Sequence, residues 1–370
     1  MNAAKHPLHA IATVIASVLR GDSDEETRTH LKTVVTGLDD IAWVRLTSRH
    51  RVVPILATCL TDLDLMEALP EDFRVYLEMM QAGNAERNGQ ILDELRLVLA
   101  RLNALGVKPC LLKGATRLVD GLYPDPSWRF MSDIDLLVPE ERLDDCSRIL
   151  EKEGYQSQVK ERLETHHAPP LWDPERAAAV ELHWRVRPEP YGRLMPTEDI
   201  IQRASPIDGP LGRYQLLHPT DQAILLIAHS QLFNGDIYYG TFRLANLIEM
   251  DWLSSTHELD WDRIFKSFTD VGRPRSCAAF LLTANRLLGT PLPANCPADS
   301  RTKLMVKRCL FQEYWGPAMT AGIYGGWVFH MYHRVTTMPD QKEARRLILA
   351  NLRDYKGKFV ALRKLIDENL

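Results

Sequence analysis

The 370-residue sequence lacks the features that mark membrane-spanning, disulfide-rich or low-complexity proteins. No hydrophobic run reaches the roughly 18 residues that a membrane-spanning helix needs. The six cysteines include no C-x-x-C pair, which favours reduced thiols in a cytoplasmic protein over a zinc site or a disulfide framework. Glycine and proline number only 20 and 22, and no repeat of fixed period is present. These absences predict a soluble, globular, cytoplasmic protein that makes no membrane contact.

A large excess of positive charge is also missing, because the formal net charge is −4. This value excludes a strongly basic nucleic-acid coat protein. The charge is uneven, however, since residues 301–370 hold thirteen lysines and arginines but only six aspartates and glutamates. Much of this positive charge falls on a helix expected at 341–368. That helix has two interpretations, a contact with RNA or an ordinary solvated face.

The spacing of hydrophobic residues divides the chain into three regions. Residues 1–105 have helical spacing, clearest in a helix that begins at Pro70 and ends at Gly106. Residues 106–199 contain short apolar runs typical of strands, and residues 200–370 return to helical spacing. The expected strands lie at 107–112, 134–138, 155–160 and 178–186. The helices expected after residue 200 lie near 219–233, 241–255, 260–270, 275–288, 301–313 and 341–368.

The sequence therefore predicts an α+β fold. A small mixed β-sheet in residues 106–199 should lie between an N-terminal helical region, residues 1–105, and a C-terminal helical domain, residues 200–370. Chemistry is expected where strands end in loops, because those ends expose side chains on a rigid support.

Two aspartates open the strand expected at 134–138. Asp133 and Asp135 are two residues apart, so they point to one face of the strand, while Ile134 and Leu136 point to the other. Two carboxylates on one face are costly unless a cation or protons neutralise them, and hard oxygen ligands suit Mg²⁺. Alone, the pair also fits a strand entry with solvated aspartates.

A third carboxylate lies in the segment E-L-H-W-R, residues 181–185. Strand alternation places Glu181, His183 and Arg185 on one face, opposite an apolar face. A carboxylate on a neighbouring strand would complete a two-metal clamp. An amphipathic strand with a polar outer face is the alternative.

A lysine and a glycine join the first expected strand to a helix. The backbone N–H groups at a helix N-terminus bind phosphate, glycine permits close approach, and Lys113 before Gly114 adds a positive charge. The spacing is not that of a Walker A loop. Alone, the segment also fits an ordinary strand-to-helix turn.

The order and spacing of these segments resemble the nucleotidyltransferase superfamily with a DNA-polymerase-β-like fold. L-L-K-G at 111–114, R-F-M-S-D-I-D at 129–135 and E-L-H-W at 181–184 are similar to the bacterial branch described as "nucleotidyltransferase family protein". The similarity is dense across 110–187. Outside that range, Arg49–Pro54, His229, Arg243 and Glu249 resemble helical segments of the same branch.

The resemblance implies a role for each matching residue. Asp133 and Asp135 would bind Mg²⁺ with the nucleotide, and Glu181 would hold the catalytic metal and accept the proton of the acceptor. Lys113 and Gly114 match the phosphate-binding turn. Many superfamily members have serine after that glycine, whereas this chain has Ala115, so Lys113 or Ser132 must supply the polar contact.

Three further residues are expected near the nucleotide or the acceptor. Arg129 lies three residues before Ser132 and could reach the phosphates, although it could also be a surface arginine of a loop. His183 and Arg185 share the face of Glu181, which favours contacts around the metal or with the acceptor.

The resemblance thus implies an Mg²⁺-dependent enzyme that uses two ions. It would move a nucleoside monophosphate from an NTP, such as ATP, to an acceptor hydroxyl and release pyrophosphate. The acceptor could be a small molecule, a peptide or protein, or a tRNA. Two other hypotheses stay open at this point: transfer of the γ-phosphate, as in a kinase, and a catalytically silent nucleotide- or RNA-binding module.

Overall fold

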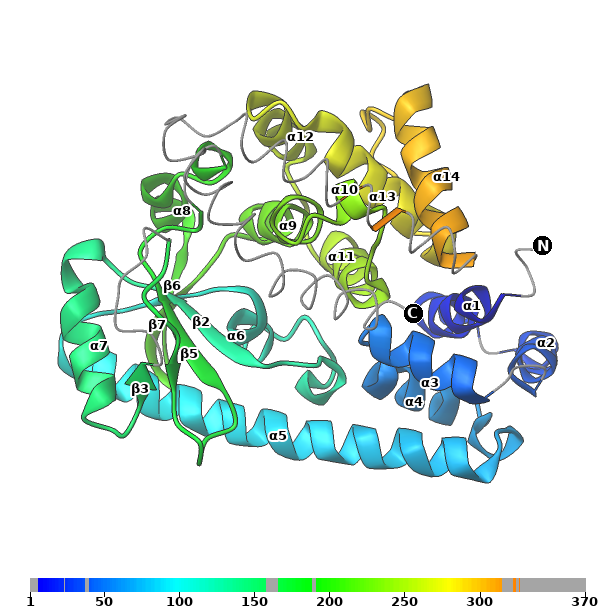
Figure 1. Ribbon diagram of the computed structural model, residues 1–370, viewed down its shortest axis with the longest axis horizontal. Coiled ribbons are helices and arrows are strands. Elements are labelled where there is room, and N and C mark those ends of the chain that lie inside the picture. The colour runs from blue at the N-terminus through cyan, green and yellow to red at the C-terminus, as the bar shows by residue number, and fades with distance from the viewer. Residues whose placement is uncertain are drawn as a thin grey trace, which may run out of the picture.

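A computed structural model describes residues 6–22, 24–36, 40–157, 166–187 and 191–314, together with residues 322, 323 and 326. The sheet lies at one end of the molecule and most of the helices lie at the other (Figure 1). The long helix α5 (Glu71–Ala104) runs along both parts. The α+β class predicted from the sequence, with helical regions on both sides of a mixed sheet, is confirmed.

The N-terminal region is helical, as predicted, and its helices begin and end at recognisable residues. Helix α1 (Pro7–Arg20) begins after His6, whose Nδ1 accepts a hydrogen bond from the backbone N–H of Leu8, at 3.2 Å. Helix α5 begins after Pro70 and ends before Gly106, which has a φ of 78° that suits glycine. The other helices here are α2 (Glu25–Thr36), α3 (Asp40–Arg49), α4 (Val53–Asp62) and a 3₁₀ turn at Met66–Ala68.

The sheet has seven strands in the order β3-β4-β5-β2-β1-β7-β6. It is mixed, since β2 pairs in parallel with β5, and β1 with β7, while the remaining neighbours are antiparallel. The parallel pair β2 and β5 forms its centre. The strands are β1 (Cys110–Leu111), β2 (Asp133–Leu137), β3 (Gln156–Ser157), β4 (Leu171–Trp172), β5 (Ala179–His183), β6 (Ser205–Gly209) and β7 (Gly212–Leu216).

The expectation that the chain is helical from about residue 200 onward was wrong for its first part. Strands β6 and β7 form a hairpin there, in which β7 pairs with β1 and β6 forms one edge of the sheet. Strand β4 was also missed. Strand β4 has only two residues, and β6 contains proline and glycine and buries none of its side chains, so both lack the apolar runs by which strands are recognised.

Short helices connect the strands. They are α6 (Lys113–Arg117), α7 (Leu143–Glu151), α8 (Thr197–Arg203) and 3₁₀ turns at Pro126–Trp128, Glu140–Arg142 and Gly192–Leu194. The C-terminal part is helical where it was predicted to be. It contains α9 (Pro219–Ala228), a π-helical turn at His229–Phe233, α10 (Asp236–Tyr239), α11 (Leu244–Thr256), α12 (Trp261–Asp270), α13 (Pro274–Leu288) and α14 (Ser300–Tyr314). The basic helix expected at 341–368 lies outside the described residues.

Two hydrophobic cores share helix α5. The first turns of α5 contribute Phe73 and Leu77 to a core formed with the N- and C-terminal helices. Its second half contributes Ile91, Leu95 and Leu99 to a core beneath the sheet. At 1.5 Å per residue a helix of 34 residues is about 50 Å long, enough to reach both cores. The helix therefore fixes the sheet relative to the helices beside it.

The structure bears on two features that the sequence lacks, a membrane-spanning helix and a disulfide framework. Within the described ranges, no helix combines the length and hydrophobicity that crossing a membrane requires. All six cysteines are among the described residues and none forms a disulfide, which agrees with the expectation of free thiols.

Candidate active site

The central strands bring two of the expected carboxylates together. In the parallel pairing of β2 with β5, Asp135 is the direct partner of Glu181, and Leu137 is the partner of His183. Side chains that are paired across neighbouring strands point to the same face of the sheet. Asp133, two residues before Asp135, also points to this face. The alternation of side chains along β2 and β5 therefore gathers the acidic residues on one side of the sheet. Asp135 and Glu181 are 46 positions apart in sequence.

Asp135 is completely buried. Its Oδ1 accepts hydrogen bonds from Lys113 Nζ at 2.5 Å and from His183 Nε2 at 2.8 Å. Burial alone would raise the pKa of this carboxyl, but the contacts with His183 and Lys113 outweigh it and hold the pKa well below its usual range. The second oxygen, Oδ2, is buried and has no hydrogen-bond partner among the described residues. A buried carboxylate oxygen without a partner is costly, so this atom is prepared to accept a further ligand.

His183 joins the two carboxylates. Its Nε2 lies 2.8 Å from Asp135 Oδ1 and 3.5 Å from Glu181 Oε2. Burial would lower the pKa of His183, but the hydrogen bonds to Asp135 and Glu181 prevail and raise it. One ligand atom from each of Asp135, Glu181 and His183 lies within 4.8 Å of the others, a spacing that could hold a metal ion. A protonated imidazole has no lone pair to offer, so the carboxylates are the better ligands.

Asp133 is half-buried beside this cluster. Ser132 Oγ lies 3.3 Å from its Oδ1. Burial and the negative charge of Asp135 raise the pKa of Asp133, while Lys113 lowers it in part. Part of this increase in pKa, after the larger effect of burial, comes from repulsion between the two aspartates. A cation bound between them would remove that repulsion.

The turn from Lys113 to Gly114 lies at the end of β1, as predicted. Lys113 has a φ of 46°, an uncommon value for a residue with a side chain, and this conformation accompanies its contact with Asp135. Gly114 follows in the first turn of α6. A Cβ atom at position 114 would lie 2.8 Å from Arg129 Nη1 and 3.0 Å from Met131 Cε. A side chain at position 114 would therefore force Arg129 or Met131 to shift.

A Gly114→Ala substitution is expected to destabilise the fold by about 1–3 kcal/mol, because the added methyl group must displace Arg129 or Met131. Gly89→Ala is a matched control, since position 89 is an exposed helical site with open space around it. That control should be neutral or stabilising by up to about 1 kcal/mol. Urea unfolding of the two variants measures the difference. Equal effects would show that position 114 tolerates a side chain.

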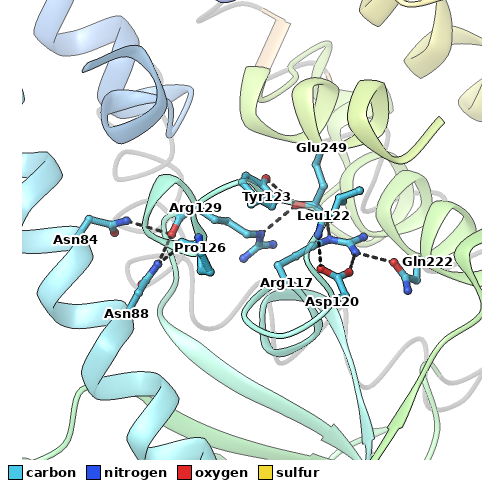
Figure 2. Close-up of polar contacts among 10 residues, drawn as sticks. All are labelled: Asn84, Asn88, Arg117, Asp120, Leu122, Tyr123, Pro126, Arg129, Gln222 and Glu249. Carbon is cyan, nitrogen blue, oxygen red and sulfur yellow. Dashed lines mark hydrogen bonds and ion pairs between the residues drawn. The ribbon is translucent and has the colours of Figure 1, made fainter. Parts of the chain in front are cut away.

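Arg129 is held in place by a glutamate from the C-terminal helices. Its Nε donates a hydrogen bond to Glu249 Oε2 at 3.0 Å, and Arg117 Nε donates to Glu249 Oε1 at 2.9 Å (Figure 2). Tyr123 also donates to Glu249, and Arg117 forms an ion pair with Asp120. Burial would raise the pKa of Glu249, but the two arginines lower it to about 2. Glu249 is thus an anion shared by two guanidinium groups.

Two asparagines of α5 hold the loop that carries Arg129. The side-chain amide of Asn88 donates to the backbone oxygens of Pro126 and Arg129, each at 2.8 Å (Figure 2). Asn84, one turn earlier, donates to the backbone oxygens of Ser127 and Arg129. Both asparagines are buried. Neither asparagine belongs to the motifs found in the sequence; their spacing of four residues, on one face of a helix, is the signal that the sequence offers for them.

A cavity of about 290 Å³ opens beside these residues. Its wall includes Lys113, Gly114, Arg129, Ser132 and Asp133 from the sheet and its loops. The helices on either side contribute further polar residues to the wall, namely Arg51, His229, Asn234, Arg243 and Asn246. Burial lowers the pKa of His229 to about 3, so its imidazole is neutral near pH 7. The arginines and Lys113 give this wall a predominance of positive charge.

One expected residue lies elsewhere. Strand β5 ends at His183, two residues before Arg185, although the strand was expected to continue to 186. The guanidinium of Arg185 is about half exposed and pairs with Glu140, at 3.7 Å. It lines a different depression, beside Pro139 and Gly192. The structure therefore brings Lys113, Gly114, Arg129, Ser132, Asp133, Asp135, Glu181 and His183 together, but not Arg185.

Comparison with protein families agrees with this arrangement. The model of a family described as uncharacterised nucleotidyltransferase matches residues 37–289, which is more than half of the chain. The match runs from α3 to α13. It therefore includes the sheet, Glu249 and the two arginines that pair with Glu249, Arg117 and Arg129. No curated protein matches the chain.

Proposed function

Because the chain belongs to this uncharacterised nucleotidyltransferase family, we propose that it transfers a nucleoside monophosphate from an NTP to an acceptor hydroxyl, with release of pyrophosphate and with the help of Mg²⁺. Family membership supports a transferase that uses an NTP. The observation that best supports the metal-dependent reaction is the buried Asp135 Oδ2, which has no partner in the described part of the chain and lies on the face shared by Asp133 and Glu181.

The carboxylates have the chemistry that Mg²⁺ requires. Asp133, Asp135 and Glu181 offer hard oxygen ligands, and the raised pKa of Asp133 indicates a need for positive charge at this point. Bound there, one or two Mg²⁺ ions would supply charge neutralisation for the triphosphate and the acceptor oxygen. His183 would orient Asp135 by donating to Oδ1, which leaves Oδ2 for the metal.

The phosphate groups are proposed to bind along the positive wall of the cavity. Lys113 contributes an ammonium group, and Gly114 permits a close approach to the backbone. Arg129 Nε is held by Glu249, so its terminal nitrogens stay near Gly114, where they could donate to phosphate oxygens. Ser132 supplies a hydroxyl in place of the serine that is absent at position 115. These donors would be positioned before the nucleotide arrives, which lowers the cost of binding.

Glu181 is proposed to take the proton of the acceptor hydroxyl. Its carboxylate is only partly buried and lies on the strand next to the aspartates, where an incoming hydroxyl could reach it. The acceptor oxygen would then form a bond to the α-phosphorus as the bond to pyrophosphate breaks. Lys113 and Arg129 would neutralise the charge that accumulates on pyrophosphate.

Calorimetry with a non-hydrolysable NTP analogue tests the metal site. We expect the analogue to bind at least about tenfold more tightly in Mg²⁺ than in EDTA, and Asp135→Asn to abolish this difference, because the variant loses a carboxylate ligand. Asp208→Asn is the matched control, since it removes an exposed aspartate at the edge of the same sheet. Binding that is independent of Mg²⁺ would instead indicate a catalytically silent nucleotide-binding module.

The position of the label distinguishes nucleotidyl transfer from phosphate transfer. An NTP labelled at the α-phosphorus and one labelled at the γ-phosphorus are incubated in parallel with the protein and a fractionated cell extract as a source of acceptor. The proposal expects the α-label on the acceptor and the γ-label in pyrophosphate. The opposite distribution would identify a kinase and overturn the proposal.

A further inference from the structure

A second hollow, of about 730 Å³, adjoins the cavity of the candidate active site. It lies among α3, α4 and α5 and is lined by five arginines, which are Arg45, Arg49, Arg51, Arg87 and Arg243. We call it the arginine groove. Neither aspartate nor glutamate is among the described residues that line it. A wall of this composition has the charge that a polyanion requires.

The arginines of the groove are not equivalent. Arg49 is largely buried and forms an ion pair with Glu313, so part of its charge is already neutralised. Arg87 donates one hydrogen bond to the backbone oxygen of Ala177, at 3.1 Å, which fixes its direction. Arg45 is exposed on α3. The groove therefore combines an arginine that a ligand can reach freely with others that are held in position.

An exposed aromatic ring lies among these arginines. Phe130 is 37% exposed, a high value for a phenylalanine. The guanidinium carbons of Arg51 and Arg87 lie 5.7 and 5.6 Å from the centre of its ring, within the range of cation–π contact. Met79 and Met80, which are also exposed, add apolar surface beside it. Bases of single-stranded nucleic acids stack on such aromatic rings and guanidinium planes.

The groove leads to the proposed reaction centre. Arg51, Phe130 and Arg243 line both the groove and the cavity, so the two hollows are continuous. Phe130 is three residues before Asp133, the first residue of β2. A chain bound in the groove could thus place its end beside the carboxylates. Ser48, whose hydroxyl lies 2.8 Å from that of Tyr76, adds a neutral partner that suits a ribose hydroxyl.

We propose that the arginine groove binds single-stranded RNA and presents its 3′-terminal hydroxyl as the acceptor. This proposal rests on the proposed nucleotidyl transfer. The 3′-oxygen forms a bond to the α-phosphorus, the bond between the α-phosphorus and its bridging oxygen to the β-phosphorus breaks, and pyrophosphate leaves with that electron pair. The hydroxyl proton passes to Glu181, and the RNA gains one nucleotide. The arginines bind phosphates, and Phe130 stacks a base.

Binding is measured by fluorescence anisotropy of a 5′-labelled single-stranded oligoribonucleotide, with the full chain, in EDTA and without NTP. Phe130→Ala is expected to weaken binding about fivefold to 150-fold, the range for loss of one stacked base. Arg45→Ala is expected to weaken binding and to reduce the slope of log K against log salt by about 0.7, the value for one lost phosphate contact. Arg96→Ala, on the same helix as Arg87 but outside the groove, should bind as the wild type does.

Several results would overturn the proposal. The first is RNA binding by Phe130→Ala and Arg45→Ala that equals that of the wild type, and the second is a loss of binding by Arg96→Ala as large as theirs. The others are an affinity of the wild type for a DNA of the same sequence, or for an acidic peptide, that equals its affinity for the RNA. Asp133→Asn separates this proposal from the proposed function, since it should bind RNA normally while losing nucleotide addition. Transfer to another acceptor without RNA binding would refute the groove alone. RNA binding without any nucleotide addition by the wild type in Mg²⁺ and NTP would refute the acceptor role.

Discussion

An Asp133→Asn variant is expected to lose nucleotidyl transfer by about three orders of magnitude while it stays folded. A carboxylate that holds a metal ion contributes several kcal/mol to the stabilisation of transition-state charge, and each 1.36 kcal/mol corresponds to a tenfold change in rate. Asparagine keeps the shape of the side chain but offers a weaker, uncharged oxygen. Turnover is followed through pyrophosphate release from Mg²⁺–NTP in the presence of the acceptor fraction.

The pKa of Asp133 explains why the fold should survive this change. Burial and the nearby Asp135 raise that pKa, so the ionised form of Asp133 opposes folding in the absence of a metal ion. Removing its charge should leave the free energy of unfolding unchanged or slightly higher. Asp135→Asn should lower it, because the ionised Asp135 is stabilised by Lys113 and His183.

The two aspartates thus make a paired test. Both variants should lose activity, but only Asp135→Asn should lose stability, as measured by urea unfolding in EDTA. Asp208→Asn should change neither quantity. Activity of Asp133→Asn close to that of the wild type would refute the assignment of Asp133 as a metal ligand.

A Glu249→Gln variant is expected to lower the free energy of unfolding by about 3–5 kcal/mol at pH 7, the cost of removing one partner from a buried ion pair. Arg117 and Arg129 would both lose their shared counterion, and the Arg117 side chain is only 3% exposed. The loop that carries Arg129 would also lose its connection to α11. Glu258→Gln is the control, because Glu258 is exposed just beyond the same helix.

The lowered pKa of Glu249 predicts how the difference in free energy of unfolding between wild type and Glu249→Gln depends on pH. The pKa is about 2 in the folded protein, compared with an ordinary value of 4.5. A lowered pKa means that the charged carboxylate stabilises the fold fully above pH 4.5, and that this contribution is lost as the pH falls toward 2. Urea unfolding at several pH values should show a constant difference between wild type and Glu249→Gln above about pH 5.5 and a shrinking one below 4.5. A difference that grows as the pH falls would contradict the assigned charge state.

Much of the architecture could be predicted from local patterns. Helix α5 begins after a proline, ends before a glycine and repeats its apolar residues, and it was placed to within one or two residues at each end. The nucleotidyltransferase family was also recognised, and the family match confirms it. Strands β4, β6 and β7 were not recognised, because their composition lacks apolar runs, and because β4 and β7 pair with β5 and β1, which are distinct elements of the chain.

The sequence by itself determined the helical regions, the central strands and the acidic residues on one face of β2, since these depend on periods of 3.6 and 2 residues along the chain. Only the tertiary structure decided which of the polar residues meet. The pairing of β2 with β5 brings His183 to Asp135, folding brings Glu249 to Arg129 across 120 positions, and Arg185 falls outside because β5 ends before it. Such contacts depend on packing between separate elements, which no local period encodes.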